Sequence, residues 1–325
     1  MTKVVAVLEP GYADYATERA LLAEHGVEVV AVPESEAAAP ALARLDPVAV
    51  LLRERPFGAG EIAAAPGLRG VVRYGVGVDN IDLAAAREAG IYVANVPDYG
   101  AEHEVSDHAV ALYLAVNRRI PARDAEVRSG GWGVGQAAMI PGRRAAVLGL
   151  VGYGRIARAA AAKFRALGFV RVLAHDPGVP DAELRREGVT PADPDTICRE
   201  ADVISLHAPL VAGTHHIIDA RRIALMKPTT ILVNVARGGL VDEPALAAAL
   251  AEGRIFGAGI DVFEDEPPAP AANPLFEAPN TVLTDHGAWY SEASVERLQT
   301  LAAQEVARVL AGQPPENWVN RWPTR

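Results

Sequence analysis

The chain has 325 residues, of which 50% are hydrophobic and 22% are charged, so it can bury a sizeable core and is not a disordered protein. Its formal net charge of −10 excludes a non-specific nucleic-acid binder and argues against docking on an anionic membrane, because both need a cationic surface. Lysine occurs only at positions 3, 163 and 227, so a side chain that binds an anion is expected to be arginine. The single cysteine, Cys198, excludes an intramolecular disulfide and is expected to be a buried, inert thiol.

The first hundred residues alternate short apolar runs with amphipathic or alanine-rich stretches, which is typical of strands and helices in a parallel sheet. Strands are expected at Val4–Leu8, Val27–Val32, Val48–Leu52, Gly70–Arg73 and Ile91–Ala94, and helices at Ala13–Glu24, Glu34–Leu45 and Ile81–Ala89. A long apolar-rich helix, Glu102–Asn117, is expected to join the two halves of the chain.

A second alternation follows. Strands are expected at Ala146–Leu150, Val170–His175, Val203–His207, Ile231–Val235, Gly257–Ile260 and Thr281–Thr284, and helices at Arg155–Leu167, Ala220–Met226 and Pro244–Glu252. A proline-rich loop at Pro267–Pro274 and a closing helix at Ser291–Leu310 complete the pattern. We therefore expect an α/β protein with two doubly wound parallel sheets. No apolar stretch approaches the roughly 18–20 residues that span a bilayer, and we expect a soluble cytoplasmic protein.

A nucleotide-binding fingerprint lies between the expected strand at Ala146–Leu150 and the helix after it. Gly152, Gly154 and Ala157 give the pattern G-x-G-x-x-G/A, in which the glycines allow a tight turn and a close approach of the backbone to a pyrophosphate. Asp176 ends the next strand, where an acidic residue accepts hydrogen bonds from ribose hydroxyls and repels a 2′-phosphate. The sequence therefore predicts NAD, rather than NADP, as the cofactor.

Three further motifs stand at or just beyond the ends of expected strands, where open α/β sheets bind ligands. They are Asn234–Gly239, Asp261–Pro267 and Asp285–Trp289. Together with the glycine motif and residues 71–82 and 95–97, they resemble the D-isomer-specific 2-hydroxyacid dehydrogenases over nearly the whole chain. Within that family, residues 278–280, 286–291 and 317–320 are most similar to the branch of the C-terminal-binding proteins.

The resemblance implies a substrate-binding arginine at Arg237, an acidic partner at Glu266 and a proton-transfer histidine at His286. Arginine can grip the carboxylate and ketone of a 2-oxo acid with its planar fork, and histidine suits proton delivery to the ketone oxygen. Further substrate contacts are expected at Arg73, Tyr74, Val76, Gly77, Tyr99 and Trp289. Cofactor contacts are expected at Gly152, Gly154, Arg155, Ile156, Asp176, His207, Pro209, Thr214, Ala236 and Asp261. No metal is expected, since no carboxylate or cysteine is spaced to join His215-His216, or His103 and His108.

The chain departs from the family pattern at two positions. The family commonly has proline where this chain has Asp285, and a carboxylate there either favours protonated His286 or points to solvent. One extra residue around His103 leaves the start of the joining helix open.

The resemblance also implies a domain organisation and a set of partners. Residues 1–99 and 291–325 are expected to form the substrate domain, in which the cofactor domain, residues 100–290, is inserted. A small 2-oxo or 2-hydroxy acid is the expected substrate, and a homodimer is expected through Glu102–Asn117 and the excursion Ile120–Gly142. Two alternatives stay open: an NAD-sensing corepressor-like scaffold, which the absence of terminal tails disfavours, and phosphoglycerate dehydrogenase proper. Formate dehydrogenase is disfavoured by the glutamate at Glu266.

Overall fold

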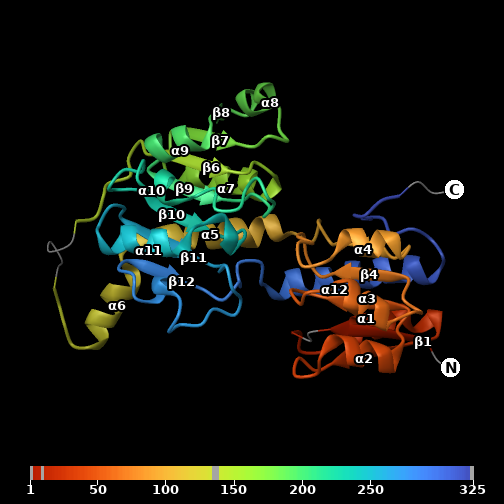
Figure 1. Cartoon of the computed structure of the whole chain (residues 1–325). Helices are drawn as coiled ribbons and strands as arrows, with labels where there is room; N and C mark the ends of the chain where they lie inside the picture. The colour runs from red at the N-terminus through yellow and green to blue at the C-terminus, as the bar shows by residue number, and fades with distance from the viewer. Residues whose placement is uncertain (1–2, 9–10, 134–138, 323–325) are drawn as a thin grey trace. The chain divides into compact units, whose positions relative to one another are not determined.

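The computed structural model describes residues 3–8, 11–133 and 139–322. The chain divides into two compact units (Figure 1): unit 1 comprises Met1–Gly100 and Ser291–Arg325, and unit 2 comprises Ala101–Tyr290. Each unit is built on its own parallel sheet, of five and seven strands, which confirms the expected fold of two doubly wound sheets. Within the described ranges, no helix is long and apolar enough to cross a membrane.

The sheet of unit 1 has the order β2-β1-β3-β4-β5, a doubly wound arrangement of the flavodoxin type. Its strands are β1 (Lys3–Leu8), β2 (Val27–Val32), β3 (Ala49–Leu52), β4 (Gly70–Arg73) and β5 (Tyr92–Ala94), and its helices are α1 (Ala16–Leu22), α2 (Ala38–Leu45), α3 (Ala59–Ala64), α4 (Leu83–Glu88) and α12 (Glu292–Leu310). The central strand β3 is buried along its length, as expected for a parallel strand with helices on both faces. Helix α12 returns from the end of the chain to pack on α1, β3 and β4.

The segment after α12 covers the edge of β5. The Val319 amide donates to the Val93 carbonyl at 2.8 Å, and the Asn320 side chain both accepts from the Val93 amide at 2.9 Å and donates to the Ile91 carbonyl at 3.0 Å. The Trp318 ring meets the Tyr92 ring edge-on, with centroids 5.0 Å apart. Part of the motif that resembles the C-terminal-binding proteins therefore has a structural task in unit 1.

The sheet of unit 2 has the order β12-β11-β10-β9-β6-β7-β8. Its strands are β6 (Val147–Val151), β7 (Arg171–His175), β8 (Thr190–Pro191), β9 (Val203–Leu206), β10 (Ile231–Asn234), β11 (Gly257–Ile260) and β12 (Thr281–Leu283), and its helices are α5 (Ala101–Arg118), α6 (Ile120–Arg128), α7 (Arg155–Ala166), α8 (Asp181–Arg186), α9 (Pro194–Glu200), α10 (Ala220–Ile223) and α11 (Glu243–Ala251). The strand order reverses between β6 and β9, and such a switch point is where open sheets of this kind bind their ligands.

Helix α5 packs closely on one face of this sheet because β11 has no side chains at two positions. A Cβ at Gly257 would lie 2.6 Å from Val116, and one at Gly259 would lie 2.7 Å from Leu112. The helix begins at Ala101 and continues without a break past His103, so the extra residue near His103 does not interrupt it.

Helix α9 lies on the other face of this sheet. Its Cys198 is fully buried, and burial raises the pKa of the thiol to about 12.

Several short elements differ from the sequence expectations. Helices α3, α6 and α8 and strand β8 were not expected, and α2 starts at Ala38 rather than at Glu34. Helix α2 starts later than expected because residues 33–36 form a turn, in which the Glu36 amide donates to the Pro33 carbonyl at 3.0 Å.

Candidate active site

The glycine turn between β6 and α7 lies at the switch point of unit 2. Gly152 has a φ of 88°, and a Cβ there would lie 2.6 Å from the backbone carbonyl of His207, so only glycine fits. Gly154 caps the start of α7 without a side-chain hydrogen bond, and a Cβ there would meet nothing within 4 Å. The positive end of α7 is therefore open on the Gly154 side and suits a pyrophosphate.

Asp176 closes this turn from the end of β7. Its carboxylate accepts hydrogen bonds from the Tyr153 amide at 2.7 Å and the Gly178 amide at 2.8 Å. A carboxylate has about four acceptor positions, so two of them can still receive ribose hydroxyls. A cavity of about 340 Å³ adjoins Asp176, and its described lining holds Asp181 and Asp193 but no lysine or arginine. These residues fit NAD, because the three carboxylates of the described lining would repel a 2′-phosphate.

The end of β9 forms the other side of the switch point. The His207 Nε2 lies 2.9 Å from the Ser205 hydroxyl, and burial lowers the pKa of His207 to about 4. The following loop is shaped by Thr214, whose hydroxyl donates to the Pro209 carbonyl at 2.6 Å and accepts from the Val211 amide at 2.8 Å. His207 is therefore neutral at pH 7, and Thr214 is engaged within its own loop.

Arg237 follows β10 in a turn held by Asn234. The Asn234 side chain donates to the Arg237 carbonyl at 2.9 Å and accepts from the Ala236 amide at 3.1 Å, and the Arg237 guanidinium donates to the Ala236 carbonyl at 2.8 Å. The next residue, Gly238, lies against the backbone of Phe263, where a Cβ would come within 1.8 Å of the carbonyl carbon. This glycine brings the Arg237 turn beside the loop that follows β11.

His286 and Glu266 form a pair at the ends of β12 and β11. The His286 Nδ1 lies 2.7 Å from Glu266 Oε2, while Glu266 Oε1 accepts from the Phe263 amide at 2.9 Å. The side chains are 21% and 30% exposed, so both remain within reach of a ligand. His286 has a φ of 55°, a left-handed conformation that is uncommon outside glycine and is often found at functional sites.

Asp261 supports the loop that carries His286. Its buried carboxylate accepts from the Thr284 hydroxyl at 2.6 Å and from the amides of Gly287 and Ala288 at 3.1 and 3.0 Å. Burial by itself would raise the pKa of Asp261, but hydrogen bonds, among them those from His108 and Thr284, outweigh it and lower the pKa. Both carboxylate oxygens thus hold the loop, and the expected contact of Asp261 with the cofactor stays a prediction.

The structure adds two supporting residues that the sequence reasoning missed. The His108 Nε2 on α5 lies 3.0 Å from the Thr284 hydroxyl and 3.4 Å from Asp261 Oδ1. Glu243 at the start of α11 is buried, which raises its pKa, and it accepts from the Glu264 amide at 2.8 Å. No sequence spacing signals either contact, because the partners are far apart in the chain.

A family model for the D-isomer specific 2-hydroxyacid dehydrogenase, NAD binding domain, matches residues 110–288, which is more than half of the chain. The chain belongs to this family. The matched model describes the NAD-binding domain of this family, so the expected family and the nicotinamide cofactor are confirmed at that level.

Curated relatives of this dehydrogenase family include a D-3-phosphoglycerate dehydrogenase of Methanocaldococcus jannaschii, 40% identical over 80% of this chain and 49% of that protein. A glyoxylate reductase of Thermococcus litoralis is 40% identical over 79% of this chain and 78% of that protein. The match thus spans about half of the first relative. Among solved structures, a D-lactate dehydrogenase from Aquifex aeolicus complexed with NAD and lactic acid has a TM-score of 0.88 at 27% identity and covers 98% of this chain and 100% of that one.

In this member of the dehydrogenase family, some of the expected substrate residues of unit 1 are buried and hydrogen-bonded, and others are exposed. The Arg73 guanidinium is buried, pairs with Glu54 and donates to the Arg53 carbonyl at 3.2 Å, and the buried Tyr74 hydroxyl donates to Glu18 at 2.7 Å. Both side chains are thus engaged within unit 1. The remaining expected residues are Val76, which is exposed, Gly77, which is half-buried, and Tyr99, which is buried.

The remaining candidates of unit 2 lie at the surface or close to it. Trp289 is half-buried and packs edge-on against Tyr290, with ring centroids 5.8 Å apart. Asp285 is exposed, which agrees with the alternative in which it points to solvent. Arg155 is exposed and Ile156 is half-buried at the start of α7.

Proposed function

We propose that this chain catalyses reversible hydride transfer between NAD(H) and a D-2-hydroxy acid/2-oxo acid pair. The observation that carries the proposal is the His286–Glu266 pair, which lies beside the Arg237 turn on the carboxyl edge of the sheet that also carries the glycine turn. The nicotinamide cofactor supplies or accepts the hydride when it is bound. The fit of Gly152, Gly154 and Asp176 to a dinucleotide without a 2′-phosphate supports NAD in this role.

Each side chain then has a task set by its chemistry. Arg237 binds the carboxylate and the ketone oxygen, since a guanidinium fork makes two parallel hydrogen bonds to such a group. His286 gives a proton to the ketone oxygen in reduction and removes it from the hydroxyl in oxidation. Because Glu266 holds Nδ1, the proton passes through Nε2. Asp261 and His108 position the loop that carries His286.

The other expected residue roles are part of this proposal. Unit 1 is assigned to the substrate, with the amides of Val76 and Gly77 as carboxylate-binding groups and Arg73, Tyr74 and Tyr99 as neighbours. Unit 2 is assigned to the cofactor, with contacts from Arg155, Ile156, His207, Pro209, Thr214, Ala236 and Asp261 in addition to the glycine turn.

A homodimer is proposed through α5 and the excursion Ile120–Gly142, of which residues 134–138 lie outside the described structure. Support comes from large apolar side chains that are exposed in the described part of that excursion, because burying them in an interface would be favourable. They are Ile120, Val127, Trp132 and Met139, each more than half exposed.

A closer kinship to the C-terminal-binding-protein branch stays a proposal. It rests on short motifs, and the structure gives Asn320 and Asn280 structural tasks: the Asn280 side chain donates to the Phe256 carbonyl at 2.7 Å. We give the dehydrogenase activity precedence over a corepressor-like scaffold because of the proton-transfer pair.

The test is turnover of NADH with a panel of 2-oxo acids that includes glyoxylate, pyruvate and larger members, and of NAD with D-3-phosphoglycerate. His286→Gln and Arg237→Gln are expected to lower kcat/KM by about 10²-fold or more. His25→Gln and Arg171→Gln, which change a histidine of unit 1 and an exposed arginine paired with Glu200, are the matched controls. No turnover in the whole panel, with NAD-dependent dimerisation retained, would reject the enzyme and favour the scaffold.

A further inference from the structure

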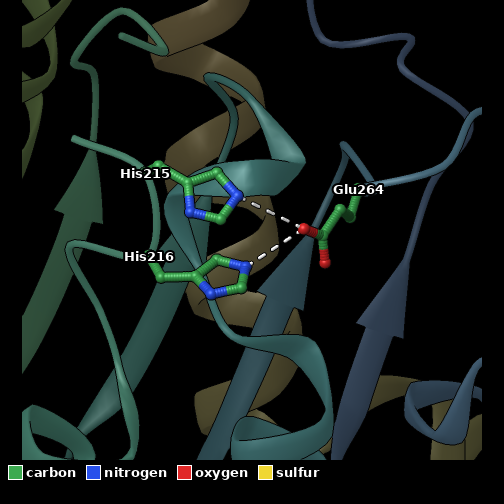
Figure 2. Close-up of side chains that lie close together, drawn as sticks. All are labelled: His215, His216 and Glu264. Carbon is green, nitrogen blue, oxygen red and sulfur yellow. Dashed lines mark hydrogen bonds and ion pairs between the residues drawn. The ribbon is translucent and has the colours of Figure 1, made fainter. Parts of the chain in front are cut away.

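A cluster of three donor side chains lies in unit 2, apart from the His286–Glu266 pair. His215 and His216 follow the loop after β9, and Glu264 lies in the loop after β11 (Figure 2). The Nε2 atoms of His216 and His215 lie 3.1 and 3.6 Å from the same oxygen, Glu264 Oε1. All three donor atoms lie within 4.8 Å of one another.

The backbone explains why two adjacent histidines face the same way. In an extended chain, neighbouring side chains point to opposite sides. His216 has a φ of 46°, and its ring stacks on that of His215 with centroids 3.9 Å apart and an interplanar angle of 26°. Histidine adopts this left-handed conformation more readily than most residues, but the conformation remains uncommon. The turn therefore presents both Nε2 atoms to one point in space (Figure 2).

Both sides of the cluster are held by hydrogen bonds that do not involve the donor atoms. The His216 amide donates to the Gly239 carbonyl at 2.8 Å, and the His215 amide donates to the Val211 carbonyl at 3.0 Å. On the other side, the buried Glu243 carboxylate accepts from the Glu264 amide at 2.8 Å and from the Asn273 side chain at 2.5 Å. The donor set is thus carried by fixed backbone, which lowers the entropy that binding an ion would cost.

We propose that His215, His216 and Glu264 form a binding site for a divalent transition metal of the zinc class. Two imidazole nitrogens and one carboxylate oxygen are a donor set that zinc uses where a fourth position stays open to water. Imidazole donors favour zinc, copper and nickel, whereas magnesium and calcium prefer sets made of oxygen alone. The half-exposed setting leaves the fourth position accessible to solvent.

The site would connect two loops that both serve the proposed active site. Glu264 stands two residues before Glu266, which holds His286, and the histidines follow the loop shaped by Thr214. A bound ion would tie these loops together and restrict the turn that carries Glu266.

The experiment is calorimetric titration of the full chain, freed of metal by a chelator, with zinc chloride. One equivalent of bound zinc is expected, and a parallel titration with magnesium chloride should give no comparable binding. His215→Ala, His216→Ala and Glu264→Gln should each weaken zinc binding by about tenfold or more. His25→Ala is the matched control, because that histidine lies 3.8 Å from a single carboxylate, Glu24, and should leave the affinity unchanged.

Two results would overturn the proposal: no zinc binding by the native chain, or equal binding by the native chain and by the His215→Ala/Glu264→Gln double variant. Melting curves without metal, recorded for every variant, separate a lost site from a lost fold, since the His215 and Glu264 side chains are 55% and 39% exposed and their replacement should change the Tm little. Cobalt(II) absorption gives a second readout, in which a tetrahedral band should form with the native chain and not with the double variant. None of these measurements requires turnover, so they test the metal site independently of the dehydrogenase proposal.

Discussion

The Glu266 carboxylate bridges His286 and the backbone of its own loop, with Oε2 lying 2.7 Å from the His286 Nδ1 and Oε1 accepting from the Phe263 amide at 2.9 Å. One oxygen thus fixes the carboxylate and the other fixes the imidazole. A ring held at Nδ1 in this way keeps Nε2 as its proton-exchanging atom.

Replacing Glu266 by glutamine removes the charge of the carboxylate and keeps its shape. The variant should therefore separate the orientation of the His286 ring from the electrostatic stabilisation of its protonated form. In Glu266→Gln, the amide can still bond the ring, but it no longer stabilises the imidazolium that proton transfer requires. We expect kcat for 2-oxo acid reduction to fall by about 10²-fold, with KM for NADH unchanged. Steady-state kinetics test this, and a variant with native kcat would show that the charge of Glu266 is not used.

His108 is a positioning residue in the proposed mechanism, since it contacts Thr284 and Asp261, which support the His286 loop. His108→Leu removes both contacts from beneath the His286 loop and should lower kcat by about tenfold or more, because small displacements of a catalytic group are costly. KM for NADH should change little. His108→Gln keeps a hydrogen-bond donor and should recover most of kcat. Equal kcat in the two variants would contradict the role.

Asp176 should determine the choice of nicotinamide cofactor. Asp176→Asn removes the charge that repels a 2′-phosphate, while its single side-chain oxygen can still accept from one of the two amides, that of Tyr153 or that of Gly178. The ratio of kcat/KM for NADH over NADPH is expected to fall by about tenfold, measured with one 2-oxo acid at fixed ionic strength. Asp181→Asn, from the same cavity, is the control; an identical change in both variants would point to a general effect of charge.

His207 should make the protein less stable in mild acid. Its folded pKa of about 4 lies below the ordinary value of 6.5, so between these pH values the unfolded chain binds a proton that the folded chain does not. Unfolding is therefore favoured as the pH falls from 6.5 towards 4. From about pH 7.5 to about pH 5, this residue should lower the free energy of unfolding by at most roughly 2 kcal/mol. Urea unfolding at both pH values should show a smaller decrease for His207→Asn, and an unchanged decrease would exclude this origin.

Trp289 is expected to pack against an apolar side chain of the substrate. Trp289→Ala should then raise KM for larger 2-oxo acids and leave KM for glyoxylate nearly unchanged, because glyoxylate has no side chain to pack. Tyr290→Ala, which removes the exposed neighbouring ring, is the control. Equal effects on all substrates would instead indicate that Trp289 only packs within the protein.

The sequence predicted the features that depend on local pattern. The apolar runs predicted nearly all strands, and Gly152, Gly154 and Asp176 predicted the nucleotide-binding turn from one strand–turn–helix unit. Short helices such as α3 and α8 were not predicted, because a segment of six residues is too short to show a clear hydrophobic periodicity.

Contacts between distant residues could not be predicted in this way. His108 and Thr284 are 176 positions apart, and His216 and Glu264 are 48 apart, yet each pair is in hydrogen-bonding contact. No metal was expected at His215-His216, because no carboxylate or cysteine is spaced in the sequence to join them. Folding supplies one, since the ends of β9, β10 and β11 meet at the same edge of the sheet.

The pairing of residues 317–320 with β5 has a consequence for how the protein behaves among its own copies. A parallel sheet ends in a row of unpaired backbone groups, and such an edge is a template for another chain. In unit 1, the Val319 amide and the Asn320 side chain form hydrogen bonds with the backbone carbonyl and amide of Val93 on this edge. Residues 317–320 thus act as a barrier to intermolecular strand addition, and a protein shortened before Asn317 would expose an aggregation-prone edge at β5.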